Sequence, residues 1–143
     1  MDLDSLGIEI HTTDAYPWLA ENRRTFDVVF DDIYLAGKTD VFRPQAWNPE
    51  LLAHLRRAVA PGGVLAVNLI TGPGHRTMQS HTRKILCGAF PQVRSLTTPA
   101  GMNEVLVAGD VVATGRQLEP YNDAFPDWRD RMFWDRVAVR RIS

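Results

Sequence analysis

The sequence is poor in cysteine, and this limits the class of protein. Cys87 is the single cysteine in 143 residues, so an internal disulfide is excluded. The fold must then rest on its hydrophobic core, and a reducing, cytoplasmic location is expected. A lone cysteine is most often a small buried hydrophobic residue, and no neighbouring pattern gives Cys87 a reactive role.

A strong net charge and a long apolar run are both missing. The formal net charge is −1, which gives no general electrostatic reason to bind nucleic acid or an anionic membrane surface. No apolar run reaches the roughly 20 residues that cross a bilayer. The opening residues MDLDSLGIEI also lack the basic and apolar regions of a signal peptide. We therefore expect neither a nucleic-acid nor a membrane partner.

The common signatures of metal and phosphate sites are missing too. The histidines have no metal-ligand spacing, so no metal site is expected; they are His11, His54, His75 and His81. The segment 71–74 has two glycines ahead of a helix but matches neither glycine-rich phosphate-binding pattern. It is predicted to be a plain strand-to-helix connection.

The composition itself is that of a globular domain. Hydrophobic residues make up 45% and charged residues 23%, and 143 residues suit a single domain covering 1–143. Strand-like and helix-like segments alternate, which predicts an α/β fold with a mostly parallel sheet. Strands are expected at 7–11, 26–30, 64–69, 93–97 and 104–108, the last two as an antiparallel hairpin. Helices are expected at 15–22, 49–59 and 76–87.

Local signals place the ends of these elements. Thr13 or Asp14 suits the N-cap of the first helix, and Asn48 followed by proline suits that of the second. The Pro61-Gly62-Gly63 segment is expected to stop the second helix and turn the chain into a strand, and Gly88 is expected to close the third helix. The segment 35–47 is predicted to be a long polar loop.

The sheet and helices are expected within 1–112, and 113–143 is expected to be a C-terminal extension. The extension carries too many large apolar side chains to leave exposed, so it is expected to pack on the core or on a partner. These side chains are Phe125, Trp128, Met132, Phe133 and Trp134.

The strand at 26–30 is followed by two acids, Asp31 and Asp32. Ligands of open α/β sheets bind beyond the carboxyl ends of the strands. Because successive strand residues alternate, the two side chains should point to opposite sides of the sheet. Asp32 is then either a catalytic carboxylate or a strand-end acid satisfied by backbone amides or loop donors. Asp31 is expected to be an exposed or capping acid.

The order of four segments resembles the spermidine synthase-like branch of the class I S-adenosylmethionine-dependent transferases. The segments are GIEIHTTDAYPWL, FDVVFDDIY, LLAHLRRAVAPGGVLAVNL and FPQVRSLTTPAGMNEVLVAG, and they span roughly Ile8 to Gly109. The resemblance implies a Rossmann-like sheet with helices on both faces. It also implies transfer of an aminopropyl or methyl group to a small acceptor from S-adenosylmethionine or decarboxylated S-adenosylmethionine.

The resemblance also implies roles for particular residues. Asp32 matches the catalytic base of the aminopropyl transferases, which takes a proton from the amine that attacks. Asp14, followed by Ala15, matches the acid that contacts the adenine of the cofactor, although a helix N-cap explains its position equally well. Tyr34 is a candidate for the acceptor pocket, with loop packing as the alternative.

Three departures from the family pattern are present. Leu35 stands where the polyamine synthases carry a further acid, and Asn68 stands where they favour glutamine. The glycine-rich loop of the first strand and the ribose-binding acid of the second strand have no counterpart. The chain is therefore expected to represent only the C-terminal part of such a domain.

This truncation would leave one strand at an edge. The family's sheet order, 3-2-1-4-5-7-6, places the first two strands beside the strand at 26–30. Without them this apolar strand becomes an edge, which invites pairing with another chain. We expect a homodimer through the edge strand Phe26 to Phe30, and the alternative is that the strand at 7–11 relocates beside this edge. The alternative function is that of a non-catalytic truncated homologue, acting as an oligomerisation or interaction module.

Overall fold

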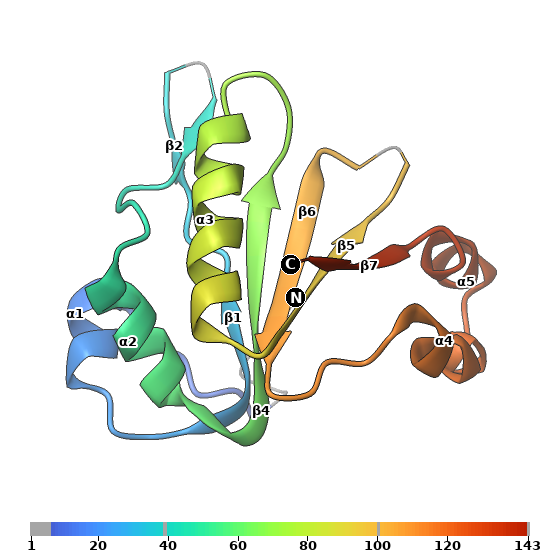
Figure 1. Cartoon of the computed structure of the whole chain (residues 1–143), viewed down its shortest axis with the longest axis horizontal. Coiled ribbons are helices and arrows are strands. Elements are labelled where there is room, and N and C mark those ends of the chain that lie inside the picture. The colour runs from blue at the N-terminus through green and yellow to red at the C-terminus, as the bar shows by residue number, and fades with distance from the viewer. Residues whose placement is uncertain (1–6, 39, 100, 143) are drawn as a thin grey trace.

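The structure is a computed structural model that describes residues 7–38, 40–99 and 101–142. A five-stranded sheet has the order β1-β4-β6-β5-β7, and a separate hairpin pairs β2 with β3 (Figure 1). The strands are β1 (Phe26–Asp31), β2 (Leu35–Ala36), β3 (Val41–Phe42), β4 (Val59–Ile70), β5 (Gln92–Thr97), β6 (Asn103–Gly109) and β7 (Ala138–Ile142). The helices are α1 (Ala15–Glu21), α2 (Pro49–Ala58), α3 (Arg76–Ala89), α4 (Gly115–Leu118), the 3-10 helix η2 (Glu119–Ala124) and α5 (Trp128–Trp134).

The directions of the strands differ from the expected ones. The mixed α/β class and the hairpin of β5 and β6 are confirmed. Only β1 and β4 are parallel neighbours, however, and the other three neighbouring pairs are antiparallel. The sheet is therefore mostly antiparallel and not mostly parallel. The reason is that β6 turns back to lie between β4 and β5, and β7 then returns along the other side of β5.

Close approach of two backbones shapes the parallel pair. The Pro61-Gly62-Gly63 turn lies within β4 and not ahead of it. Gly62 has a φ of +79°, a conformation that favours glycine. A Cβ atom at Gly63 would lie 2.7 Å from the backbone oxygen of Asp27. The turn thus lets β4 run beside β1, with Val28 opposite Val64 and Asp31 opposite Val67.

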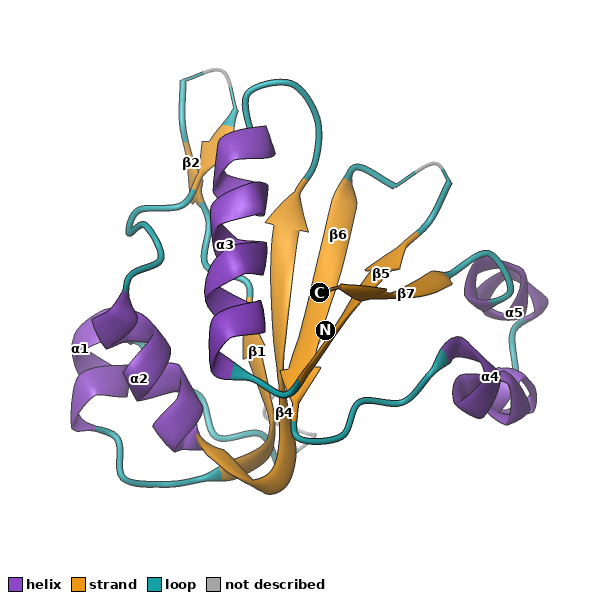
Figure 2. Ribbon diagram, viewed as in Figure 1, coloured by secondary structure: helices purple, strands orange, loops and turns teal. Residues whose placement is uncertain are grey.

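The helices α1, α2 and α3 lie on one side of the sheet (Figure 2). The predicted N-caps are present: the Asp14 carboxylate accepts a hydrogen bond from Tyr16 N, and the Asn48 side chain accepts one from Leu51 N. Alternate residues of β4 and β6 face these helices and are buried with them. The central buried residues are Leu51, Leu55, Leu65, Val67, Leu69, Leu86 and Leu106.

Among the described residues, the opposite side of the sheet is covered near β7, where α4 packs. Over β1, the side chain of Phe30 is 78% exposed and that of Val28 is 46% exposed. Helices therefore lie on both sides, but β1, whose apolar sequence is typical of a strand buried on both faces, is not covered on this side. The reason is that α1, α2 and α3 share one side. We refer to the side bearing Val28 and Phe30 as the open face.

Three segments differ from the predictions. Residues 7–11 form no strand, because no neighbouring strand pairs with them, and Ile8 and Ile10 are exposed. The predicted loop at 35–47 contains the β2–β3 hairpin. Gly88 lies inside α3 and does not close it, since Phe90 is the C-cap.

The C-terminal extension contributes a strand to the sheet. β7 pairs with β5 from Ala138 opposite Thr97 to Ile142 opposite Val93. Phe125 and Trp134 contact each other, with ring centroids 5.5 Å apart, whereas Trp128 and Met132 are exposed. The side chain of Phe133 lies outside the described part. Within the described residues, no helix has the length and apolar character needed to cross a membrane.

Candidate functional site

A hollow of about 810 Å³ lies on the open face of the sheet, near the carboxyl ends of β1 and β4. Phe30, Ala66 and Val105 contribute apolar side chains from three neighbouring strands. The β5–β6 connection and Trp134 of α5 line the hollow from the other side. Its mostly apolar lining contains a polar pair, Asp32 and Asn68, which makes it the candidate site.

Asp32 and Asn68 are joined by a hydrogen bond. Asn68 Nδ2 donates to Asp32 Oδ1 at 2.8 Å, and the Asp32 residue is exposed. Asn68 Oδ1 is buried and has no hydrogen-bond partner among the described residues. The exposed Asp32 carboxylate is therefore the oxygen acceptor that the pair offers to the hollow. Such a pair favours a ligand that donates hydrogen bonds or carries positive charge.

Tyr34 supports this pair and does not line the hollow. Its hydroxyl donates to the backbone oxygen of Asn68 at 3.1 Å and accepts from Ile70 N at 3.4 Å. Because β1 ends at Asp31, opposite Val67, the Tyr34 hydroxyl takes over backbone groups of β4 that β1 no longer reaches. Burial raises the pKa of Tyr34. The contacts of Tyr34 are those of loop packing, which was the alternative to a place in an acceptor pocket.

Asp31 is not the exposed or capping acid that we expected. It is buried, and its two carboxylate oxygens accept from Arg43 Nη1 and Nη2, each at 2.7 Å. Burial alone would lower the pKa of Arg43, but the hydrogen bonds and charge of Asp31 outweigh it, so the pKa is raised. Asp31 and Asp32 thus lie on opposite sides of the sheet, as the alternation of strand residues predicted.

The Arg43 side chain ties the segment after the β2–β3 hairpin to the end of β1. Its Nε donates to Gln45 O at 3.0 Å, and the guanidinium lies 5.1 Å from the ring centroid of the buried Trp47. Sequence reasoning missed this arginine, because it lies in a segment that was predicted to be a loop. The only available signal was the unusual presence of Arg43 and Trp47 close together in that segment.

Asp14 and Ala15 are separated from Asp32 by the sheet. Asp14 caps α1, whose packing on α2 keeps it on the covered side, and Ala15 is the first residue of that helix. The structure therefore brings together Asp32, Asn68 and Tyr34 but not the predicted adenine-binding pair.

A second buried acid was also missed. Glu104 of β6 is fully buried, and both of its carboxylate oxygens accept from Arg83 Nη2 at 2.7 Å. The Ser95 hydroxyl also donates to Glu104 Oε1. These contacts tie α3 to β5 and β6 on the covered side, so Glu104 has a structural role. Within the described residues, no group of three or more metal-ligating side chains occurs.

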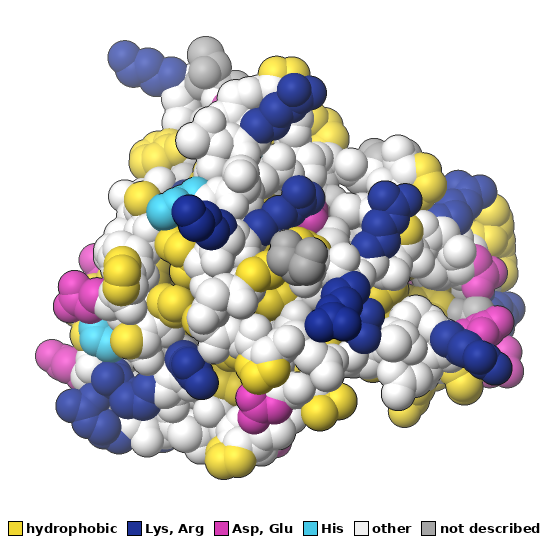
Figure 3. Space-filling view, in the orientation of Figure 1, with side chains coloured by type: hydrophobic (Ala, Val, Ile, Leu, Met, Phe, Trp, Pro, Cys, Tyr) yellow, Lys and Arg dark blue, Asp and Glu magenta, His cyan; other side chains and the backbone are white. Residues whose placement is uncertain are grey.

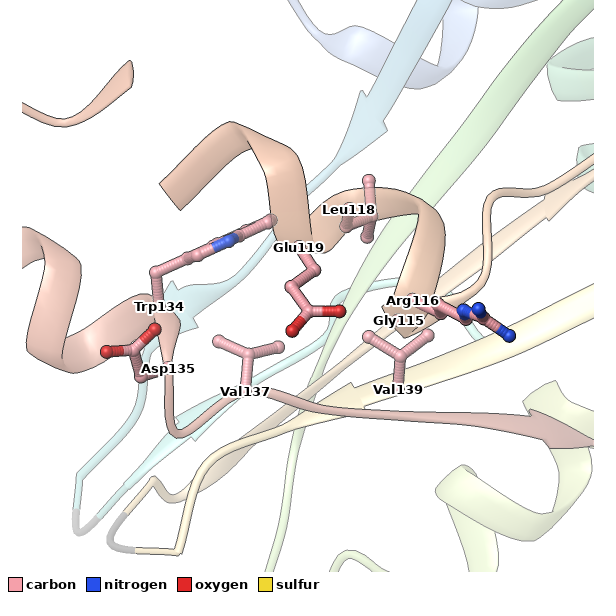
Figure 4. Close-up of a pocket in the computed structure, with 8 residues that line it drawn as sticks. All are labelled: Gly115, Arg116, Leu118, Glu119, Trp134, Asp135, Val137 and Val139. Carbon is pink, nitrogen blue, oxygen red and sulfur yellow. The ribbon is translucent and has the colours of Figure 1, made fainter. Parts of the chain in front are cut away.

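A smaller hollow of about 410 Å³ lies between α4, η2 and the segment leading to β7 (Figure 4). Val137 and Val139 lie along one side, and the carboxylate of Glu119 points toward Val137, while Arg116 points away (Figure 4). Trp134 lines both this hollow and the one at Asp32. The C-terminal extension therefore borders the candidate site without filling it.

Charge on the visible surface is spread out. Figure 3 shows lysine and arginine side chains dispersed over the face that carries α3, with apolar and uncharged areas between them. On this face, basic side chains do not gather into one patch.

The fold and the site define the class of this protein as a mixed α/β protein with an acid–amide pair facing an apolar hollow. A scan against models of known protein families gives no match, and a search of curated proteins gives none either. The geometry of the site and the resemblance of the four segments are therefore the grounds for a function.

The described residues fit an acceptor better than they fit S-adenosylmethionine. The Asp32 carboxylate suits a small amine, because it is exposed at the hollow and accepts hydrogen bonds. Asp14, the expected adenine contact, lies across the sheet and uses its carboxylate to cap α1. Among the described residues, the expected adenine contact therefore does not join Asp32 in one site.

Proposed function

We propose that this chain is a spermidine synthase-like transferase-fold protein that binds a small amine acceptor, with Asp32 as the base. The observation that carries this proposal is the hydrogen-bonded Asp32–Asn68 pair at the mouth of the apolar hollow. Aminopropyl or methyl transfer from an S-adenosyl donor is the reaction class that the resemblance implies.

The order of the strands supports the proposal. The observed order β1-β4-β6-β5 is the same as the order 4-5-7-6 in the second half of the sheet that the resemblance implies. In both orders, the last of the four strands in the sequence lies between the two strands that precede it in the sequence. Here β6 lies between β4 and β5. Asp32 follows the first strand of this set, at its carboxyl end, where ligands of open α/β sheets bind.

The chemistry of the pair suits an amine. A small amine is protonated at neutral pH, and a carboxylate at the hollow can hold the ammonium by a charge-assisted hydrogen bond. The Asp32 carboxylate then accepts one proton, which leaves the amine nitrogen with a free electron pair. Asn68 orients the carboxylate by donating to one of its oxygens and leaves the other available.

Calorimetric titration tests this function. The probes are S-adenosylmethionine, decarboxylated S-adenosylmethionine, methylthioadenosine and the diamine putrescine. We expect putrescine to bind, and Asp32→Asn to weaken its binding by about tenfold, the loss of one charge-assisted contact. Asp27→Asn, at an exposed acid of the same strand, is the matched control. Absence of binding for all four probes would remove the transferase proposal.

A second function is favoured by a separate observation. Phe30 and Val28 expose apolar surface at an edge strand, which suits an oligomerisation or interaction module. This module needs no catalytic group, so a chain that binds none of the four probes is expected to act in this way.

A further inference from the structure

The outer edge of β1 has no strand beside it among the described residues. β1 is the first strand in the order of the five-stranded sheet, and residues 7–11 form no strand that could cover it. Its backbone groups on that side are available for a ladder with another strand. The exposed side chains of Val28 and Phe30 lie on the same face of this edge. A long exposed apolar edge of this kind is normally covered or blunted by charge.

We propose that β1 pairs antiparallel with β1 of a second copy of this chain, about a two-fold axis at Val28. The axis is perpendicular to the sheet, so the two sheets join into one continuous sheet with both open faces on the same side. The interface is then self-complementary, as closed two-fold dimers require. This proposal goes beyond the transferase function and does not depend on it.

The charged residues near β1 favour an axis at Val28 over an axis at Asp27, Val29 or Phe30. An axis at Asp27 would place Asp27 opposite itself, and an axis at Val29 would place Asp27 opposite Asp31 of the second copy. Both arrangements put like charges directly across from each other, which is destabilising in a sheet. An axis at Phe30 would place Val28 opposite Asp32 of the second copy, an apolar group against a charge.

The axis at Val28 puts no like charges opposite each other and keeps apolar side chains together on the open face, while Asp27 lies opposite Val29 of the second copy on the other face. It places Val28 opposite Val28 of the second copy and Phe30 opposite Phe26 of the second copy. Phe26 is partly buried against the core, so it offers only its exposed part to Phe30. Two residues further out, the same register places Asp32 opposite Arg24 of the second copy. Apolar pairs thus lie at the centre, with an opposite-charge pair at each end.

Arg24 and Asp32 are both available for this pairing. The Arg24 side chain is 60% exposed and contacts Glu9 at 2.8 Å, an exposed ion pair that is easily exchanged. Asp32 accepts from Asn68 through Oδ1, so Oδ2 can accept from Arg24 of the second copy. The pairing uses the same carboxylate as the proposed base, so the dimer and amine binding are expected to compete.

Sedimentation velocity over a range of chain concentrations measures the association directly. We expect a monomer–dimer equilibrium. Val28→Lys places two like charges at the axis and is expected to abolish the dimer. Val111→Lys makes the same change at an exposed position after β6 and is expected to leave it intact. A strict monomer, or a dimer that survives Val28→Lys, would overturn the proposal. Circular dichroism checks that each variant is folded.

Charge exchange tests the register without altering the axis. Arg24→Asp and Asp32→Arg each place like charges opposite each other, so each alone is expected to weaken the dimer by about tenfold or less, as for a cross-strand charge pair. The double variant restores opposite charges and is expected to recover the dimer. Additive losses in the double variant would rule out this register.

Cysteine pairing locates the axis. In a Cys87→Ala background, Val28→Cys places two thiols directly opposite, with Cα atoms about 4.5 to 5.5 Å apart, which a disulfide can bridge. Phe30→Cys places them four residues apart along the strand, about 13 Å, which is too far. We expect the first variant to form a covalent dimer under mild oxidation and the second to remain monomeric on a denaturing gel. Crosslinking of Phe30→Cys with none of Val28→Cys would contradict the axis.

Discussion

Asp31 and Asp32 are neighbours in the sequence but have different environments. The difference arises because successive side chains along a strand point to opposite faces of the sheet. Asp31 points to the covered side, where Arg43 contacts both of its oxygens. Asp32 points to the open face, where Asn68 contacts one oxygen. A buried ion pair fixes structure, whereas an exposed carboxylate can exchange partners. At this scale, Asp31 belongs to the fold and Asp32 to the candidate site.

Removing the charge of Asp31 should destabilise the fold strongly. Asp31→Asn leaves the Arg43 guanidinium buried without its carboxylate, which is expected to cost about 3–5 kcal/mol of unfolding free energy. Urea denaturation measures the loss, and Asp27→Asn, at an exposed acid, should change stability by less than about 0.5 kcal/mol. The double variant Asp31→Leu with Arg43→Met should lose less than Asp31→Asn alone. Equal losses in the double and single variants would contradict the ion-pair account.

At the scale of elements, β4 requires a glycine at position 63, whereas α3 has room for a side chain at position 88. Gly63 lies where β4 passes β1, with the backbone oxygen of Asp27 at 2.7 Å from a built Cβ atom. Gly88 lies inside α3, where a Cβ atom would meet nothing within 4 Å. The same Gly→Ala change therefore meets backbone at one position and open space at the other.

Gly63→Ala and Gly88→Ala should change the free energy of unfolding in opposite directions. Gly63→Ala forces β1 and β4 apart and is expected to cost about 1–3 kcal/mol, the range for overpacking. Gly88→Ala removes backbone freedom from the unfolded chain and is expected to gain about 0.5–1 kcal/mol. Thermal unfolding of both variants under one condition measures the difference. A gain for Gly63→Ala would show that β4 does not need its close approach to β1.

At the scale of the whole molecule, two tyrosines couple stability to alkaline pH. Burial raises the pKa of Tyr16 and that of Tyr34 above the ordinary value of 10.0. In the pH range between the unfolded and the folded pKa, the folded chain keeps a proton that the unfolded chain has lost. The unfolded state then binds fewer protons, so the free energy of unfolding falls as the pH rises.

The contribution of these two tyrosines to stability should therefore be level below about pH 9 and decline above about pH 10. The decline has an upper limit of about 1.4 kcal/mol per pH unit for each tyrosine, and partial solvent exposure reduces it. Tyr34→Phe should lower stability at neutral pH, because Asn68 O and Ile70 N lose their partner, and should make the alkaline decline shallower. Urea denaturation from pH 7 to pH 11 measures both effects. An unchanged alkaline slope in Tyr34→Phe would assign the effect to other groups.

Local signals in the sequence determined α1, α2 and α3 and the N-caps of the first two, but not the helices of the C-terminal extension or the C-cap of α3. Asp14 and Asn48 cap α1 and α2 because each side chain reaches backbone groups two or three residues away, so residue order is sufficient. The hairpin of β5 and β6 and the mixed α/β class follow equally from local patterns. The apolar character of the strand at 26–30 was also evident, although its burial was not.

Only the tertiary structure decided which side chains meet across long separations. Arg43 reaches Asp31 over 12 residues, and Arg83 reaches Glu104 over 21, and no local pattern indicates either pair. The strand directions depend on how β6 and β7 return along the sheet, and the exposure of Phe30 depends on α1, α2 and α3 sharing one side. Sequence alternation placed Asp31 and Asp32 on opposite sides of the sheet, and packing decided which of the two faces the hollow.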